Sequence, residues 1–237
     1  MMRWMHLRLH APLAAFGGEA IDAHRVIRNV PAQSMLTGML ANALGWTRTM
    51  RAEHQALQDR IVFGALWERD LGLSRMTDYQ TAQLGKKDRA WTTRGTPAGR
   101  AGGAATYAGA HQRWREYHPD LRMAVVLRLE PADAAPMLDA LAQALDRPAR
   151  PLFIGRKCCL PSSRIFGGWV KDARNAHAAL EAVAGSDGDG KLAFWPETEG
   201  PAGAGRRMVT DERNWITGLH GGGRFVREGL IGSRGEA

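Results

Sequence analysis

Hydrophobic and polar residues alternate near the N-terminus in a way that predicts a β-strand. Met5, Leu7 and Leu9 are separated by single residues. A period of two places these apolar side chains on one face of an extended chain. We therefore expect a first strand at about residues 3–9, with one buried face.

A second stretch has the period of an α-helix. It starts behind Ser34 and stops before Gly45, and its apolar positions are three and four residues apart: Met35, Leu36, Met39, Leu40, Ala43 and Leu44. Serine is a preferred N-cap residue, and glycine readily adopts the left-handed conformation that ends a helix. The pattern predicts a helix over this stretch with Ser34 as its cap.

Further elements follow from the same kinds of pattern. Residues 61–67 form a mostly apolar run that predicts a strand, and residues 122–129 are rich in β-branched and aliphatic side chains between Pro119 and Pro131. The latter run is typical of a central strand. A second helix is predicted at about 133–145, and a third is predicted further on with Asp172 as its cap.

Residues 92–109 interrupt this regularity. They are rich in Gly, Ala, Thr and Arg and show no apolar period, so they cannot bury enough surface to form a core of their own. We expect a thumb-like insertion at about 78–113 that projects from the body.

The order of elements favours an α+β fold. Strand, helix, strand, insertion, strand and helix are compatible with a split β-α-β plan, which RNA-recognition modules also use. The expected architecture is an RRM-like (ferredoxin-like) body of residues 1–77 and 114–166, the thumb-like insertion 78–113, and a smaller, partly β C-terminal region of residues 167–237. A chain of 237 residues is long enough for one such elaborated domain.

The charge of the chain indicates a polyanionic partner. The formal net charge is +8 and the pI is about 10.2, which favours nucleic acid. Most of the excess lies between Gln80 and Arg115, where Asp88 is the one acidic residue among seven basic ones: Lys86, Lys87, Arg89, Arg94, Arg100, Arg113 and Arg115.

The cysteines and the N-terminus bear on the compartment. Cys158 and Cys159 are adjacent, which is poor geometry for an ordinary disulfide and lacks zinc-ligand spacing, so a reducing cytoplasm is expected. The N-terminus lacks the apolar stretch of a signal peptide, and no run approaches the roughly 18 apolar residues of a membrane span. We expect a soluble cytoplasmic protein with no membrane partner.

The sharpest local motif is a basic turn. Phe153 and Ile154 lead into Gly155, Arg156 and Lys157. Glycine allows close approach of a ligand to the main chain, while a guanidinium and an ammonium bind phosphate oxygens. The motif is typical of a strand edge that passes a backbone phosphate to a tight turn, although taken alone such a turn is more often a solvated surface turn.

Two residues near this motif have alternative interpretations. Trp114 is either a core residue or an exposed one, whereas Arg115 lies where the insertion rejoins the body and could stack on a base or hold a phosphate. Phe153 either stacks on a nucleobase or fills the core, depending on the face it occupies.

The start of the predicted helix is a further candidate site. Ser34 follows a basic loop that contains Arg25 and Arg28. Helix N-termini bind anions, so the amides and the Ser34 hydroxyl could hold a phosphate in addition to capping the helix.

Signatures of catalysis are few. The eight histidines show no metal-binding spacing, and the chain has neither a phosphate loop of the GxxxxGK[ST] type nor a G-x-S-x-G elbow. One option is metal-free RNA cleavage by Tyr117, His118 and Lys157, if the fold brings them together. Otherwise no catalytic residue, metal or cofactor is expected.

Three of these segments together resemble a known family. PLFIGRKCCLPSS at 151–163, WREY at 114–117 and PAQSMLTGMLANALGWTR at 31–48 are similar to the Cas-five subunit of type I-E CRISPR Cascade complexes, in order from Leu7 to about Phe166. The resemblance implies a non-catalytic subunit that grips the 5′ handle of the CRISPR RNA. It would cap the helical backbone built by subunit CasC, contact the large subunit CasA, and meet target DNA only through the complex.

The resemblance also assigns residues. Handle contacts would come from Arg115, Phe153, Gly155, Arg156 and Lys157, and thumb cations along the guide or the neighbouring backbone subunit from Lys86, Lys87, Arg89 and Arg94. The adjacent Cys158 and Cys159 stand where the family often has a single cysteine, and the chain beyond about Gly167 matches poorly.

Two other functions remain open. Relatives in type I-C systems process guide RNA with comparable residues, which implies a metal-independent endoribonuclease as the alternative, whereas type I-E systems assign that task to a separate subunit. An ordinary RRM-like protein for cellular RNA is the third possibility.

Overall fold

A computed structural model describes residues 2–68, 74–83, 90–91, 97–98, 110–185, 190–202 and 205–232. The predicted thumb cations fall outside these residues. Of the helices in the described part, none is both long enough and apolar enough to cross a membrane.

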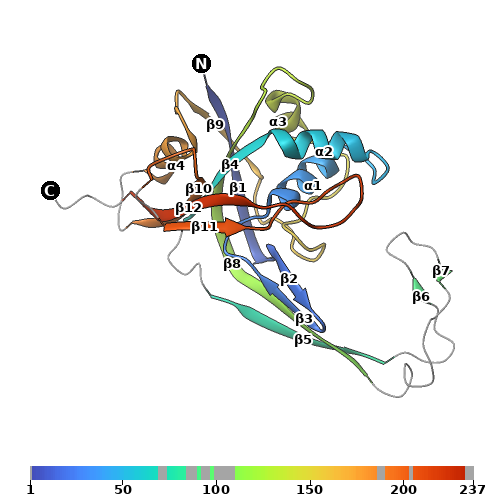
Figure 1. The fold of residues 1–237 in the computed structure, drawn as a ribbon. Coiled ribbons are helices and arrows are strands. Elements are labelled where there is room, and N and C mark those ends of the chain that lie inside the picture. Colours follow the sequence, from blue (N-terminus) through green and yellow to red (C-terminus); the bar gives the residue numbers. More distant parts are fainter. Residues whose placement is uncertain are drawn as a thin grey trace.

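A ten-stranded sheet runs through the molecule (Figure 1). Its main path has the order β11–β12–β10–β4–β8–β1–β9, with bounds β1 (Arg3–Ala14), β4 (Ile61–Trp67), β8 (His111–Leu129), β9 (Phe166–Lys171), β10 (Lys191–Pro196), β11 (Gly205–Val209) and β12 (Arg224–Ile231). Three strands join it beside β8, with bounds β2 (Gly17–Ile21), β3 (His24–Ile27) and β5 (Met76–Ala82). A separate pair is formed by β6 (Ala90–Trp91) and β7 (Pro97–Ala98).

Four helices accompany the sheet in the described part of the chain: α1 (Gln33–Ala43), α2 (Arg51–Arg60), α3 (Leu138–Asp146) and α4 (Ala176–Ala184). The mixed α and β class is as predicted. In the middle of the sheet, β4, β8, β1 and β9 are mutually antiparallel neighbours. Helices α1 and α2 connect β1 to β4, and α3 connects β8 to β9, so each connection passes over an intervening strand.

The core follows from the alternation seen in the sequence. Met5, Leu7 and Leu9 point to the face that packs against α1 and α3 in the largest hydrophobic cluster. Trp4 points the other way, into a second cluster with α4. The predicted strands at 3–9 and 61–67 are therefore confirmed as parts of β1 and β4, and β8 is central as expected.

Three predicted boundaries are wrong. Helix α1 has Ala32 at its N-cap, and Ser34 lies inside the first turn. Helix α3 begins at Leu138 and not at 133, because the preceding loop turns its carbonyl oxygens toward the Arg60 guanidinium, which donates to four of them at distances of 2.5 to 3.3 Å. Helix α4 is capped by Asn175, whose Oδ1 accepts from the Ala178 amide at 2.9 Å, and not by Asp172.

Strand β8 is much longer than its predicted part. It passes through Pro119, which lies opposite Leu13 of β1, and Asp120 has a positive φ of 43°. The inner part of β8 pairs with β1 and β4 in the body, whereas residues 111–117 pair with β5. Residues 151–163 contain no strand, so the expected strand edge before Gly155 is wrong.

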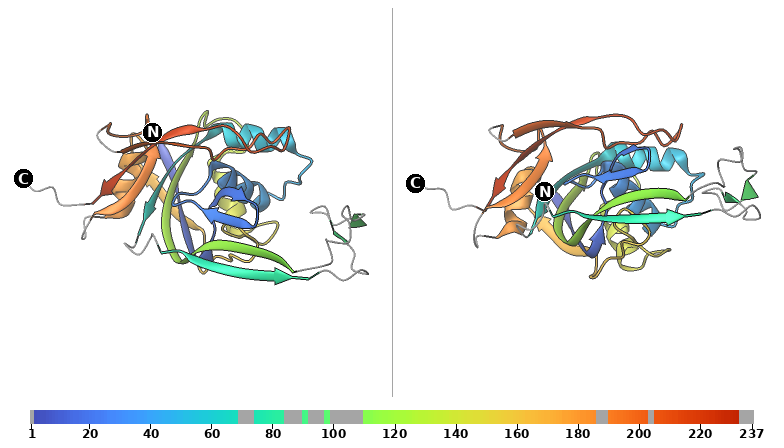
Figure 2. Two further views of the ribbon diagram at one scale, coloured as in Figure 1. Left: turned by 60° about the horizontal axis from the view of Figure 1, so that its bottom comes forward. Right: turned by 90° about the horizontal axis from the view of Figure 1, so that it is seen from below.

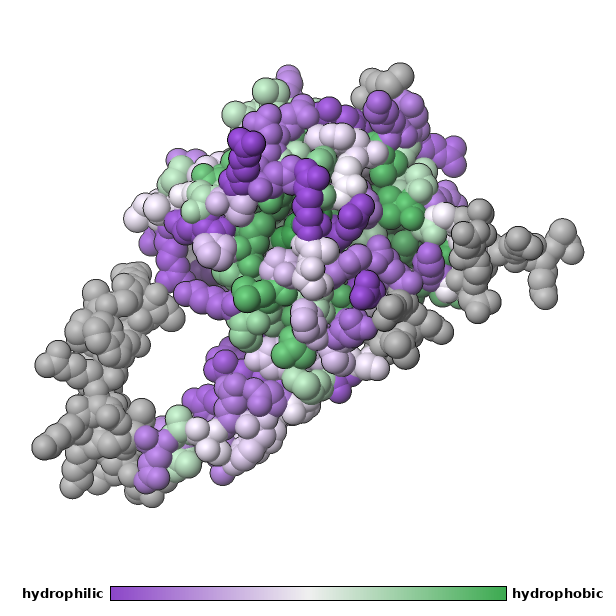
Figure 3. Space-filling model, turned by 180° about the vertical axis from the view of Figure 1, so that it is seen from behind, coloured by the Kyte–Doolittle hydropathy of each residue, from purple (hydrophilic) through white to green (hydrophobic). Residues whose placement is uncertain are grey.

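We call β3, β5 and residues 111–117 of β8 the ribbon. In two further views it leaves the body in one direction, with no described helix against its outer part (Figure 2). Seen from behind, it is an arm with few hydrophobic residues, whereas hydrophobic residues gather over the body (Figure 3).

Candidate nucleic-acid interface

One face of the ribbon gathers positive charge. Arg25 of β3 lies directly opposite Arg115 of β8, and on its other side Arg115 faces Asp78 of β5. Arg113 and Tyr117 share this face because alternate residues of a strand point to the same side. We call it the cationic face.

The two facing arginines carry an electrostatic cost. Like charges directly opposite across strands destabilise a sheet, and within the described ranges no ion pair involves Arg25 or Arg115. Arg25 is exposed and Arg115 is half-buried. An anion bound between them would offset the repulsion.

The basic turn adds a third guanidinium to this face. Arg156 lies over the Tyr117 ring, 4.5 Å from its centre. Its Nη1 donates to the Glu116 carbonyl at 2.8 Å and its Nη2 to the Arg25 carbonyl at 3.4 Å. Arg156 therefore ties the turn to β8 and β3, and the structure brings Arg25, Arg115 and Arg156 together.

Gly155 is required by the packing of its turn. Its φ is +90°, and a Cβ at this position would lie 1.8 Å from the carbonyl oxygen of Ala15. The Ala15 amide donates to the Ile154 carbonyl at 3.2 Å, and the Ile154 amide donates to the Cys159 carbonyl at 2.8 Å. Close packing of the turn on the chain that follows β1 thus requires a glycine, and it holds Arg156 at a fixed position.

Lys157 and Phe153 flank this turn. Lys157 is exposed and follows Arg156 in the turn. Phe153 is half-buried in the irregular segment before the turn, and it belongs to no hydrophobic cluster of the described residues. Its position fits neither of the two sheet faces considered from the sequence.

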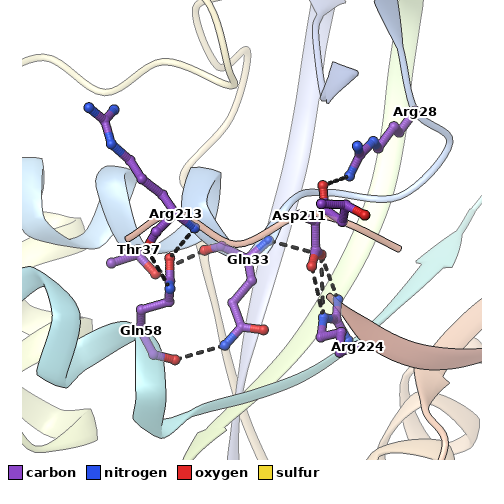
Figure 4. A network of polar contacts seen from close by, with 8 residues as sticks. Arg28, Gln33, Thr37, Gln58, Asp211, Arg213 and Arg224 are labelled. Atoms are coloured by element: carbon purple, nitrogen blue, oxygen red, sulfur yellow. Dashed lines mark hydrogen bonds and ion pairs between the residues drawn. The ribbon is translucent and has the colours of Figure 1, made fainter. Parts of the chain in front are cut away.

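The N-terminus of α1 is already occupied by an anion of this chain. The Asp211 carboxylate accepts from the Gln33 amide at 3.1 Å (Figure 4). The Asp211 carbonyl accepts from the Ser34 amide at 3.0 Å. Arg224 pairs with the same carboxylate at 2.9 Å. The amides expected to bind phosphate beside Ser34 therefore have partners within the chain, which argues against an anion site there.

Arg28 belongs to the same region. Its Nη1 donates to the carbonyl oxygen of Thr210 at 2.5 Å (Figure 4), so it ties the loop after β3 to the loop before Asp211. The structure thus separates Arg28 and Ser34 from the cationic face, while Arg25 belongs to it.

Sequence reasoning missed an aromatic row on the opposite face of the ribbon. His24 of β3 and Tyr79 of β5 lie on either side of Trp114 in the pairing register. The His24 and Trp114 rings stack at 4.6 Å with 8° between their planes, and the Tyr79 ring lies 5.1 Å from Trp114. Strand β5 is a polar segment with little apolar alternation, so no local pattern indicates its pairing with β8.

The candidate cleavage residues are not brought together. Tyr117 and His118 are consecutive in β8 and point to opposite faces. His118 is 1% exposed between Phe16 and Trp67, and its Nε2 donates to the Arg28 carbonyl at 2.8 Å. Burial lowers the pKa of His118.

Tyr117 is also poorly suited to proton transfer. Burial raises its pKa, and so does the contact of its hydroxyl with the Cys158 thiol, at 3.7 Å. The neighbouring Cys159 is buried, which raises the pKa of its thiol to about 11. Lys157 is exposed nearby, but the structure shows no hydrogen bond among Tyr117, His118 and Lys157 within the described residues.

The fold is similar to that of chains in solved structures of CRISPR-associated proteins. A chain of a solved structure described as a CRISPR RNA-guided surveillance complex has a TM-score of 0.68 at 18% identity, covering 96% of this chain and 90% of that one. Another, described as a crystal structure of a Cas protein, has a TM-score of 0.61 at 23% identity, covering 96% and 94%. At these identities the likeness concerns the fold.

The family is shown by a match along the sequence. The model described as CRISPR-associated protein (Cas_Cas5) matches residues 4–227, so the chain belongs to this family, the Cas-five family. It is 27% identical to the CRISPR system Cascade subunit CasD of Escherichia coli (strain K12), over 78% of this chain and 80% of that protein. The resemblance inferred from the motifs is confirmed, and the family match extends through most of the C-terminal region, where the motifs had ended.

Proposed function

We propose that this protein is a non-catalytic CRISPR RNA-binding subunit of a type I-E Cascade complex, and that it grips the 5′ handle of the guide. The observation that carries the proposal is the convergence of Arg25, Arg115 and Arg156 on the cationic face. Three guanidiniums at one place, with no ion pair to Arg25 or Arg115 within the described residues, favour a chain of phosphates. The family membership and the similarity to CasD support this choice of ligand.

The shape of the molecule supports a division into body and thumb. The split connections between β1, β4, β8 and β9 support the proposal of an RRM-like body. The ribbon would be the stem of the thumb; Lys86, Lys87, Arg89 and Arg94, the proposed thumb cations, lie outside the described residues. In the complex, the thumb would reach along the guide or the adjacent CasC subunit, and other surfaces would contact CasA.

The alternative, a metal-independent endoribonuclease, is less well supported. It requires Tyr117, His118 and Lys157 to act on one phosphate, but β8 points the first two to opposite faces and His118 is buried. In this proposal Tyr117 has another task, because its ring supports the Arg156 guanidinium.

A salt titration of guide binding tests the proposal. The complex is reconstituted with wild type, Arg115→Ala, or the control Arg174→Ala, which removes an exposed arginine on the α4 side of the body. Each phosphate neutralised on a single strand contributes about −0.7 to the slope of log affinity against log salt. Arg115→Ala should lower affinity for an intact handle and flatten the slope by about that amount, whereas Arg174→Ala should change neither.

Two outcomes would contradict the proposal. The first is wild-type affinity of Arg115→Ala for the intact handle at every salt concentration. The second is specific cleavage of the cognate repeat hairpin by the purified protein, lost in Lys157→Ala or His118→Ala. The latter result would establish the endoribonuclease instead.

A further inference from the structure

The aromatic row of the ribbon has no role in the phosphate contacts proposed above. His24, Trp114 and Tyr79 occupy one register position on three neighbouring strands. Tyr79 is 51% exposed, His24 is exposed, and Trp114 is half-buried. None of the three belongs to a hydrophobic cluster of the described residues.

The geometry of the row leaves ring surface open at its outer end. Trp114 has His24 on one side and Tyr79 on the other, with ring centres 4.6 and 5.1 Å away. Tyr79 lies on β5, which pairs only with β8 among the described strands. Since β5 is the outermost strand of the ribbon, the Tyr79 ring is the accessible end of the stack.

The neighbours of the row are nearly neutral. Thr81 and Gln112 face each other two positions further out along the strands. Toward the body, Glu116 accepts hydrogen bonds from the Ile27 amide and from Arg75, both at 3.2 Å, so its charge is compensated. The cationic face thus suits phosphates, whereas this face offers stacking surface flanked by polar groups without net charge.

We propose that the aromatic row is a stacking site for one unpaired nucleobase of the bound RNA. A strand that runs along the β5 edge would place phosphates toward Arg115 and turn a base onto Tyr79 and Trp114. Bases stack on aromatic side chains with little dependence on sequence or salt. The inference rests on the proposed function, because it needs a single strand held at the cationic face.

The test uses 2-aminopurine, a base whose fluorescence is quenched by stacking. It replaces each handle nucleotide in turn in an RNA with the host's own repeat sequence, and the complex is reconstituted with wild type, Tyr79→Ala, Tyr79→Phe or Met208→Ala. Met208 is 63% exposed on β11, which lies at the end of the main sheet path and not in the ribbon. It therefore serves as the control.

We expect one handle position to be quenched in the wild type and bright in Tyr79→Ala. Affinity in Tyr79→Ala should fall by about 5- to 150-fold, the range for loss of one stacked base, with an unchanged salt slope. Tyr79→Phe and Met208→Ala should stay close to wild type.

The outcomes separate this inference from the proposed function. If Arg115→Ala weakens handle binding while Tyr79→Ala changes neither affinity nor fluorescence, the RNA-binding role stands and the stacking site is refuted. If neither variant has an effect, both fail. If Tyr79→Ala lowers the unfolding temperature of the RNA-free chain far more than Met208→Ala does, the row packs against this chain's own residues and the inference is overturned.

Discussion

Removing the Asp211 carboxylate should destabilise the protein strongly, because one buried group serves two elements. Asp211 is 3% exposed and accepts from the α1 amide of Gln33 at 3.1 Å and from Arg224 at 2.9 Å. Loss of a helix cap costs about 0.5–2 kcal/mol. Removing one partner of a buried ion pair costs about 3–5 kcal/mol, because the remaining charge is left uncompensated.

These two costs overlap, so we expect Asp211→Ala to lower the free energy of unfolding by about 3–5 kcal/mol. The measurement is urea unfolding followed by circular dichroism, with an unchanged m-value as the sign that the same surface unfolds. The control is Asp139→Ala, which breaks the exposed ion pair to Arg3 at 2.6 Å and should cost under about 1 kcal/mol.

A double substitution isolates the contribution of the unpaired charge. In Asp211→Ala with Arg224→Met, no unpaired guanidinium remains beside Phe63, over which Arg224 lies 4.4 Å from the ring centre. Much of the lost stability should return, leaving roughly the cost of the missing cap. If the double variant is as unstable as the sum of the two single variants, the uncompensated guanidinium is not the main source of the lost stability and the reasoning is refuted.

Further substitutions test the turn, the loop before α3 and the buried histidine. Gly155→Ala places a methyl group against the Ala15 carbonyl at a φ of +90°. It should lower the free energy of unfolding, measured in urea, by at least about 1–3 kcal/mol. Wild-type stability of this variant would contradict the close packing of the turn. In Arg60→Lys the ammonium cannot reproduce the several hydrogen bonds that the guanidinium donates to the loop carbonyls. The free energy of unfolding should therefore fall by about 1–3 kcal/mol. An unchanged free energy of unfolding would show that the loop conformation does not depend on these bonds. Because the folded pKa of His118 is lowered, the unfolded chain binds more protons, and stability should fall as pH drops below about 6.5. His118→Gln should make that decline shallower in thermal melts between about pH 7.5 and 5.5, and an unchanged pH profile would exclude His118 as its source.

Local sequence patterns predict an element correctly where its structure does not depend on a particular partner segment. The apolar run of β4 and the helical spacing in α1 predicted both elements, since burial of one segment against a common core needs no knowledge of its partner. The cap of α1 could not be predicted, because Asp211 comes from a loop remote in the sequence.

The candidate site shows the same limit. Arg115 and Arg156 were identified from charge and from the family motifs, but their meeting depends on the packing of Gly155 against Ala15. The partnership of Arg25 with Arg115 depends on a parallel pairing of β3 with β8. Neither contact leaves a periodic signal in the sequence, because each joins segments distant along the chain.

The pairing of β1 with β8 has a consequence for the order in which the protein folds. Leu7 lies opposite Val125, so the centre of the body joins the first strand to one from the second half of the chain. Contacts between distant segments close a long loop and slow folding. During synthesis, β1 emerges early, and the backbone groups that pair with β8 stay without this partner until β8 has left the ribosome. A nascent chain stalled before β8 should therefore be sensitive to protease. Once β8 is present, the body and the ribbon should become resistant to protease together, because β8 pairs with strands of both.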